Sequence, residues 1–319
     1  MKMRTSPDRE RGSAVLMAML VATLAVLLVT GAFVRQSVLA AEVEHARSRA
    51  QARWILFGAV DWIRAVLAED ARTTAADHAG EPWAVPLAPT RIESANDVPA
   101  WLSGRVEDAQ ARFNLRNVVG AEGPVAAEVA ALSRLMENVG ADSRYAASIA
   151  LRIQAQLQPR AVGHAWVALS SLDELQFDDP GERSTFARIR PFTTILPVAS
   201  PLNVNTAAAE VLSARFDDLP LAQARQLVES RNLRHFRDLA DFEARLPGFR
   251  PHGGAGRIAV GSRFFHVRGR IQYRGADLRS TALVRREGSR IDLLWIREDV
   301  PDSASILPSA GGAAGRNSS

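Results

Sequence analysis

The N-terminal part of the chain changes from an unbroken apolar run to an amphipathic pattern without a turn between the two. Residues 14–34 carry no charge and are long enough, as a helix, to cross a hydrocarbon core of about 30 Å. Residues 35–70 contain no proline, one glycine at Gly58, and many Ala, Arg, Glu and Leu residues. The pattern predicts one long helix over residues 13–70, membrane-spanning in its first half and amphipathic in its second.

The amphipathic half carries a stripe of mostly apolar residues at helical spacing, surrounded by charged side chains. The stripe consists of Val43, Ala46, Ala50, Trp54, Phe57 and Asp61. A face of this kind packs on a globular head or on other helices, and the sequence leaves both open.

Residues 124–251 follow mostly helical periodicity. One helix is expected over 125–139, closed by Gly140, and a second over 142–157, capped by Asp142. These features indicate a helical body.

Two further capping patterns follow within this helical body. Ser171 and Glu174 have the spacing of a capping box, in which the serine oxygen accepts from the amide of Glu174 while the glutamate reaches back. Asn205 or Thr206 is expected to cap the next helix, and another helix is expected over 221–231.

The C-terminal part alternates between apolar and polar residues with the period of a β-strand. Residues 265–273, 278–285 and 291–296 alternate in this way, with turns at Gly275 and at 287–289. The sequence therefore predicts a three-stranded antiparallel meander.

Two short strands are also expected upstream, over 101–107 and 112–115, after an extended, proline-rich connection around Trp83. Together these elements predict an α+β fold, in which a long N-terminal helix packs on an antiparallel β-sheet and a large α-helical domain is inserted. The expected division is 1–12 leader, 13–70 long helix, 71–115 first part of the head, 116–255 inserted helical domain, 256–300 meander, and 301–319 disordered tail.

The charge pattern indicates a membrane rather than a nucleic acid. The formal net charge is +4, and the basic residues Lys2, Arg4, Arg9 and Arg11 precede the apolar run. Because basic flanks stay in the cytoplasm, the leader is expected there and the head on the other side of the membrane. The remaining chain is nearly neutral, so no basic groove for nucleic acid is expected. The alternative is a cleaved signal peptide, with Val38-Leu39-Ala40 as the cleavage site and a released chain starting at Ala41.

Candidate catalytic residues are few. The chain has no cysteine, which excludes disulfides, thiolate metal sites and cysteine nucleophiles. The histidines show no paired metal-ligand spacing and do not accompany a nucleophile motif, so no enzyme is expected. They are His45, His78, His164, His235, His252 and His266, of which His266 is expected to be solvated on the polar face of a strand.

A group of carboxylates lies in a stretch with Pro180 and Gly181. These carboxylates are Asp173, Glu174, Asp178, Asp179 and Glu182. Hard oxygen ligands in a flexible loop suit calcium, and a solvated acidic loop is the alternative.

Several stretches resemble one family of membrane-anchored proteins. Arg11-Gly12 followed by Ser13, an apolar helix and an amphipathic extension is similar to the start of type IV pilins and pseudopilins. Further segments resemble, in the same order, the K-type minor pseudopilin of type II secretion systems (GspK): GEPWAVPL (80–87), VEDAQARFNL (106–115), SSLDEL (170–175) and PLNVNTAAAEVL (201–212). The resemblance covers most of residues 11–273.

The resemblance implies a non-enzymatic subunit at the tip of the pseudopilus, which starts its assembly and supports export of folded periplasmic proteins. It implies cleavage after Gly12 by the prepilin peptidase, N-methylation of Ser13, anchoring in the inner membrane through residues 14–34, and a periplasmic head. I-type and J-type minor pseudopilins are the implied partners. Met17 stands where most pseudopilins carry a glutamate, which pairs with the N-terminal amine of the subunit ahead. A subunit with no neighbour ahead has no amine to pair with, so the resemblance implies an apolar residue at this position. Members of the family also bind calcium in the inserted domain, although their Asp-rich segment has no clear counterpart between Ala155 and Val167.

The layout around LNVNTAAAEVL is also similar to the helix-hairpin-helix of membrane-anchored DNA-uptake receptors. In those modules a glycine-bearing hairpin lets backbone amides approach phosphate. Here the hairpin is Asp217-Asp218-Leu219-Pro220, which has no glycine and places two carboxylates where phosphate would lie. A packing role for this segment is therefore favoured, and nucleic acid is not expected as a partner.

Overall fold

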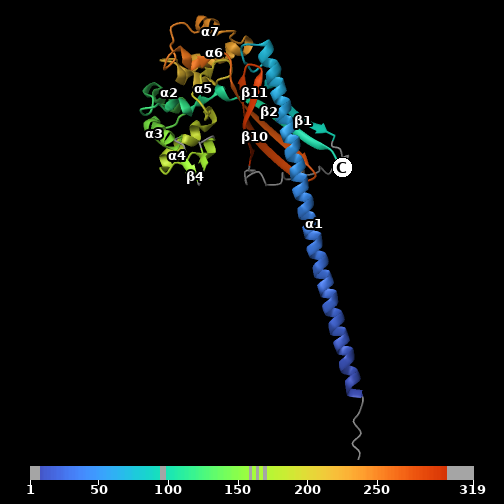
Figure 1. Ribbon diagram of the computed structural model, residues 1–319. Helices are drawn as coiled ribbons and strands as arrows, with labels where there is room; N and C mark the ends of the chain where they lie inside the picture. Colours follow the sequence, from blue (N-terminus) through green and yellow to red (C-terminus); the bar gives the residue numbers. More distant parts are fainter. Residues whose placement is uncertain (1–7, 94–97, 158–159, 163–164, 168–170, 300–319) are drawn as a thin grey trace, which may run out of the picture.

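The computed structural model describes residues 8–93, 98–157, 160–162, 165–167 and 171–299. Its dominant element is α1, a single helix over Asp8–Thr73 that extends far beyond the head (Figure 1). Within the described residues, the segment Ala14–Thr73 is the one helix long and apolar enough to cross a membrane. The continuous helix predicted from the sequence is therefore present. The leader residues 1–7 and the tail 300–319 lie outside the described residues.

The head is built on a five-stranded sheet in the order β1-β2-β9-β10-β11, and all its neighbouring strands are antiparallel. Its strands are β1 (Leu87–Ile92), β2 (Ala100–Asp108), β9 (Phe264–Tyr273), β10 (Ala276–Glu287) and β11 (Arg290–Asp299). The meander of the last three strands is confirmed. Its tight turns contain Gly275 and Gly288, whose φ angles of 80° and 57° favour glycine.

Helix α1 packs on one face of this sheet through residues spaced mostly four apart. Ser48, Ala52, Leu56, Val60 and Leu67 are buried there. Gly269 in β9 lets the helix approach, since a Cβ atom at that position would lie 3.0 Å from Leu56 Cδ2.

The predicted stripe lies elsewhere on the helix. Val43, Trp54 and Phe57 are 67%, 75% and 39% exposed, so the residues that pack on the head are a different row. The sequence had left open whether the stripe binds the head or other helices, and in this structure it does not cover the head.

A helical body interrupts the sheet between two paired strands. The chain leaves β2 after Asp108 and returns at Phe264, although Asp108 and Phe265 are register partners. This excursion extends beyond the expected range 116–255 at both ends. Its helices are α2 (Ala126–Asn138), α3 (Ala146–Leu157), α4 (Pro180–Ile189), α5 (Ala209–Arg215), α6 (Leu221–Leu233) and α7 (Leu239–Arg245).

The helical body has its own apolar core, lies beside the sheet in Figure 1, and includes three two-stranded pairings. Its short strands are β3 (Phe113–Asn114), β4 (Arg160–Val162), β5 (Ala165–Val167), β6 (Thr193–Thr194), β7 (Leu202–Asn203) and β8 (Ile258–Ala259). The prediction that residues 112–115 join the head sheet is therefore wrong, because β3 pairs in parallel with β6.

Local caps agree only in part with the sequence. Asp142 accepts from the amide of Arg144, as expected for a cap. Ser171 accepts from the amide of Asp173 rather than that of Glu174, so the capping box does not form.

Two further local predictions are wrong. Helix α5 has no side-chain cap at Ala208, because Asn205 and Thr206 instead bind residues outside the helix. The stretch around Trp83 is a short 3-10 turn over Pro82–Ala84, with the indole buried, rather than an extended connection.

Candidate functional site

The residues expected for processing lie on the first turns of α1. The backbone at Gly12 and Ser13 is helical and continuous with the apolar segment. Met17 follows one turn later and is 67% exposed, in an 18-residue window of which none is buried. An apolar side chain at this position matches a helix that is surrounded by lipid or by other helices.

Farther along α1, several aromatic side chains are exposed. Trp54, Phe57 and Trp62 are 75%, 39% and 54% exposed, and the rings of Trp54 and Phe57 lie 6.1 Å apart. This surface, here called the aromatic face, consists of Trp54, Phe57 and Trp62.

An apolar cavity of about 270 Å³ lies between α1 and strands β1 and β2, and Trp62 forms part of its wall. Other lining residues are Ala59, Ile63, Val66, Val85 and Leu87. Exposed apolar patches can mark sites of interaction with other proteins, so the aromatic face and this cavity are a candidate contact surface.

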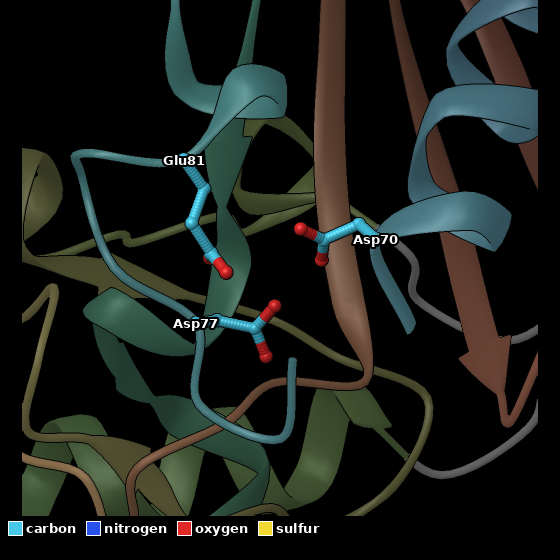
Figure 2. A group of neighbouring side chains, drawn as sticks. All are labelled: Asp70, Asp77 and Glu81. Atoms are coloured by element: carbon cyan, nitrogen blue, oxygen red, sulfur yellow. The ribbon is translucent and has the colours of Figure 1, made fainter. Parts of the chain in front are cut away.

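A polar cluster lies where the end of α1, the sheet and the helical body meet. Asp70 in the last turns of α1 and Asp77 and Glu81 in the following connection are 7%, 1% and 3% exposed. One oxygen atom from each carboxylate lies within 4.8 Å of the others. Figure 2 shows the three carboxylates pointing toward one another. We call these residues the acidic triad.

Arg286 of β10 is the counterion of two members of the triad. It binds Asp70 at 2.9 Å and also forms an ion pair with Asp77. Burial raises the pKa of Asp77 to about 6, against the opposing effect of Arg286. The pKa of Asp70 is also raised, first by burial and then by the charge of Glu81.

Glu81 is held by neutral donors. Its carboxylate accepts from the Thr74 hydroxyl at 2.8 Å, from the amide of His78 at 2.9 Å, and from the Trp83 indole at 2.8 Å. These bonds fix the connection between α1 and β1, and they bury Trp83 against Phe265 with ring centroids 5.2 Å apart.

Asp108 connects the sheet to the helical body beside the triad. Its Oδ2 atom accepts from Asn203 Nδ2 at 2.8 Å, from Ser262 Oγ at 2.7 Å, and from the Thr206 hydroxyl. Burial raises the pKa of Asp108, and these hydrogen bonds oppose that shift. Asn203 and Thr206 therefore anchor the helical body to the sheet, although the sequence had suggested Thr206 as a helix cap.

The carboxylates proposed from the sequence as calcium ligands are not brought to one point. Asp178 and Glu182 bind Arg152 at 2.7 and 2.9 Å, and Asp179 caps α4 by accepting from the amide of Glu182. Asp173 forms an ion pair with Arg190, and Glu174 forms one with Arg297. Among the described residues, the acidic triad is the one group of three whose ligand atoms converge.

Three of the described histidines, His78, His235 and His252, contact other side chains of the head, whereas His45 is exposed on α1. His78 and His235 stack with ring centroids 3.9 Å apart, and His252 Nδ1 lies 3.0 Å from Asp217. His164 lies outside the described residues.

His266 is half-buried rather than solvated, contrary to the sequence expectation, because Thr194 of the helical body lies beside it. Burial, followed by the charges of Arg112 and Arg268, lowers the pKa of His266 to about 4. Its Nε2 atom lies 3.5 Å from Thr194 Oγ1 of the helical body.

The hairpin before α6 keeps the negative charge seen in the sequence. Asp218 has a φ of 55° and is 96% exposed at its side chain, and its carboxylate lies 3.6 Å from Arg134. Phosphate would meet this carboxylate at the start of α6, which argues against a DNA-binding hairpin.

Sequence reasoning missed the acidic triad because no short motif contains it. Asp70 and Arg286 are 216 positions apart. One signal was available, since Asp70 is in helical phase with Leu56, Val60 and Leu67 and so places a carboxylate on the buried face of α1.

Comparisons with known proteins agree with this architecture. A family model for protein K of the type II secretion system (T2SS) matches residues 202–259. The type II secretion system protein K of Pseudomonas aeruginosa is 26% identical over 333 residues, covering 95% of this chain and 96% of the relative. The corresponding protein of Pectobacterium carotovorum is 26% identical, covering 90% and 96%.

The fold is also that of a solved structure. The crystal structure of the GspK-GspI-GspJ complex from the type 2 secretion system of enterotoxigenic Escherichia coli contains a chain that matches with a TM-score of 0.62 and 20% identity. The match covers 79% of this chain and 97% of that chain. The resemblance to protein K that the sequence motifs indicated is therefore confirmed over most of the chain.

Proposed function

From the premise that this chain is similar over nearly its whole length to protein K of type II secretion systems, we propose that it is the minor pseudopilin at the tip of the pseudopilus. In this role it starts pseudopilus assembly, supports export of folded periplasmic proteins, and acts as a structural subunit rather than as an enzyme. The observation that carries the proposal is the match of 95% of the chain to a protein K, together with one unbroken helix that joins an apolar segment to the head.

The membrane arrangement follows from the same helix. Residues 14–34 anchor the chain in the inner membrane, the basic leader stays in the cytoplasm, and the head lies in the periplasm. The prepilin peptidase cleaves after Gly12, and the new N-terminus at Ser13 is methylated. The apolar Met17 suits a subunit with no neighbour ahead of it, because no N-terminal amine needs to be paired there.

I-type and J-type minor pseudopilins are the proposed partners, and the aromatic face of α1 is their proposed contact. The face is exposed while the opposite row of α1 is buried on the sheet. Its large rings supply the contact area that dominates binding in protein interfaces.

Co-purification tests this proposal. The tagged full-length chain, extracted in mild detergent from cells that also express the I-type and J-type subunits, is expected to retain both on an affinity resin. Failure to retain either subunit, with all three chains expressed and folded, would contradict the assignment. Salt-dependent binding to DNA by the same preparation would instead favour an uptake receptor.

A further inference from the structure

The acidic triad holds more negative charge than its counterion balances. Asp70, Asp77 and Glu81 meet at one point, and Asp108 lies nearby, since Asn203 Nδ2 donates both to the Asp77 carbonyl oxygen at 3.1 Å and to Asp108 Oδ2 at 2.8 Å. Arg286 binds Asp70 and Asp77. In the part of the chain that the structure describes, the hydrogen-bond donors to Glu81 and Asp108 are hydroxyl, amide and indole groups, which are neutral. Buried carboxylates without compensating charge are costly.

One oxygen atom in the cluster has no hydrogen-bond donor. Asp77 is 1% exposed, and its Oδ2 atom accepts from the amide of Ser262 at 2.6 Å and from Arg286. Its Oδ1 atom is buried and has no hydrogen-bond partner. Figure 2 shows the Asp77 carboxylate directed toward Asp70 and Glu81. Because an ionised carboxylate only accepts, this oxygen requires a donor or a cation.

We propose that Asp70, Asp77 and Glu81 bind a divalent cation, Ca²⁺, at the junction of α1, the sheet and the helical body. All three ligands are carboxylate oxygens, which calcium prefers, whereas zinc, copper and nickel favour nitrogen or sulfur ligands. Magnesium requires near-ideal octahedral geometry and keeps several waters, so a site of three buried carboxylates suits calcium better. The site is distinct from the carboxylates between Asp173 and Glu182, which bind arginines or cap α4.

A bound cation would connect three parts of the molecule. Asp70 ends α1, Asp77 and Glu81 fix the connection to β1, and Asp77 binds the Ser262 amide at the return from the helical body. The cation would offset the cost of burying three carboxylates that share one arginine. Calcium therefore stabilises the orientation of the helical body on the head.

Terbium luminescence tests the site directly, because the Trp83 indole binds Glu81 at 2.8 Å and is placed to sensitise a bound lanthanide. The full-length chain in detergent is first stripped with a chelator and then titrated with Tb³⁺, with Ca²⁺ as competitor. Calorimetry with Ca²⁺ alone gives the stoichiometry and Kd. The expected result is one ion per chain with a Kd below about 1 mM, as in extracellular calcium modules. Tm should rise by roughly 3–6 °C at a hundredfold excess over Kd.

Matched variants locate the ion. Glu81→Gln and Asp77→Asn are expected to weaken Ca²⁺ binding at least tenfold, whereas Asp178→Asn in the other acidic group leaves it unchanged. Trp83→Phe should lose the luminescence yet keep the Ca²⁺-dependent rise in Tm, which keeps the test valid if a triad variant does not fold. Absence of saturable binding by the wild-type chain would overturn the proposal. So would binding that survives both triad variants or is lost only in Asp178→Asn.

Discussion

The carboxylate of Glu128 in α2 and the guanidinium of Arg215 in α5 form an ion pair at 2.9 Å, with side chains that are 0% and 1% exposed. Arg257 approaches the same carboxylate at 3.2 Å, and the Arg215 guanidinium lies over the Phe113 ring, 5.0 Å from the ring centroid. The pair joins two helices of the helical body at the centre of its core.

Removing the charge of Glu128 should leave two arginines without their counterion. Glu128→Gln is expected to lower the free energy of unfolding by about 3–5 kcal/mol, since a buried unpaired charge is costly. Chemical unfolding of the detergent-solubilised chain measures the change. Glu69→Gln is the matched control, because Glu69 and Arg72 are 66% and 62% exposed, and its cost should stay below about 1 kcal/mol. Equal costs for the two variants would contradict this account of the core.

The contact between α1 and the sheet should depend on the absence of a side chain at Gly269. Gly269→Val is expected to cost about 1–3 kcal/mol of stability, because a branched side chain meets Leu56. In a chain that also carries Leu56→Ala, Gly269→Val should cost less stability, because two residues in contact are coupled. Thermal unfolding of the wild type, the two single variants and the double variant gives the coupling energy. Strictly additive costs would show that α1 does not contact β9 closely at this point.

His266 should make the protein less stable in acid. Its pKa in the folded chain is lowered to about 4 from 6.5, so the unfolded chain binds more protons between these values. Its contribution is complete above about pH 6.5 and is lost as pH falls toward 4. The pKa of Asp77, raised to about 6, acts in the opposite direction. The difference between wild type and His266→Gln isolates the histidine, and stability curves that run parallel from pH 7 to 4 would contradict its burial.

The aromatic face should contribute to partner binding without supporting the fold. Trp54→Ala and Phe57→Ala are expected to weaken retention of the I-type and J-type subunits by about 2 kcal/mol or more each if they are central to the contact. Leu151→Ala is the control, because Leu151 is 57% exposed on α3, away from the membrane helix. Tm values near wild type for all three variants would separate binding from folding. Unchanged retention in the Trp54 and Phe57 variants would place the contact elsewhere.

Met17→Glu tests the position of the subunit at the tip. A carboxylate without a partner amine costs about 2.5–3.5 kcal/mol in lipid, so membrane insertion or tip assembly should weaken while cleavage after Gly12 continues. Membrane fractionation and co-purification measure the two effects. A variant indistinguishable from wild type in both would contradict the assigned role of Met17.

The sequence predicted those parts of the fold in which periodicity determines burial. Strands β9, β10 and β11 alternate clearly, and α2 and α3 carry apolar stripes. Strand β1 was missed because Pro89 argues against a strand, yet β1 is an edge strand with mostly exposed residues, where proline is tolerated. Strand β3 was misplaced because two residues of extended chain do not specify their partner strand.

The candidate sites differ in how well they can be predicted from the sequence. Gly12, Ser13 and Met17 form a local pattern, so they can be proposed as functional residues from the sequence alone. The acidic triad depends on the return of β10 beside the end of α1, which brings Arg286 to Asp70 across 216 positions. The carboxylates from Asp173 to Glu182 are close in sequence, but arginines from α3, β11 and the end of α4 separate them in space.

The intact mass of the membrane-bound protein tests the central assignment most directly. The chain is expressed with the prepilin peptidase, extracted from washed membranes, and analysed by mass spectrometry with N-terminal peptide mapping. A chain that starts at Ser13 and carries one added methyl group is the predicted result for a minor pseudopilin. A chain that starts at Ala41 and is free of the membrane would identify a secreted protein and contradict the account.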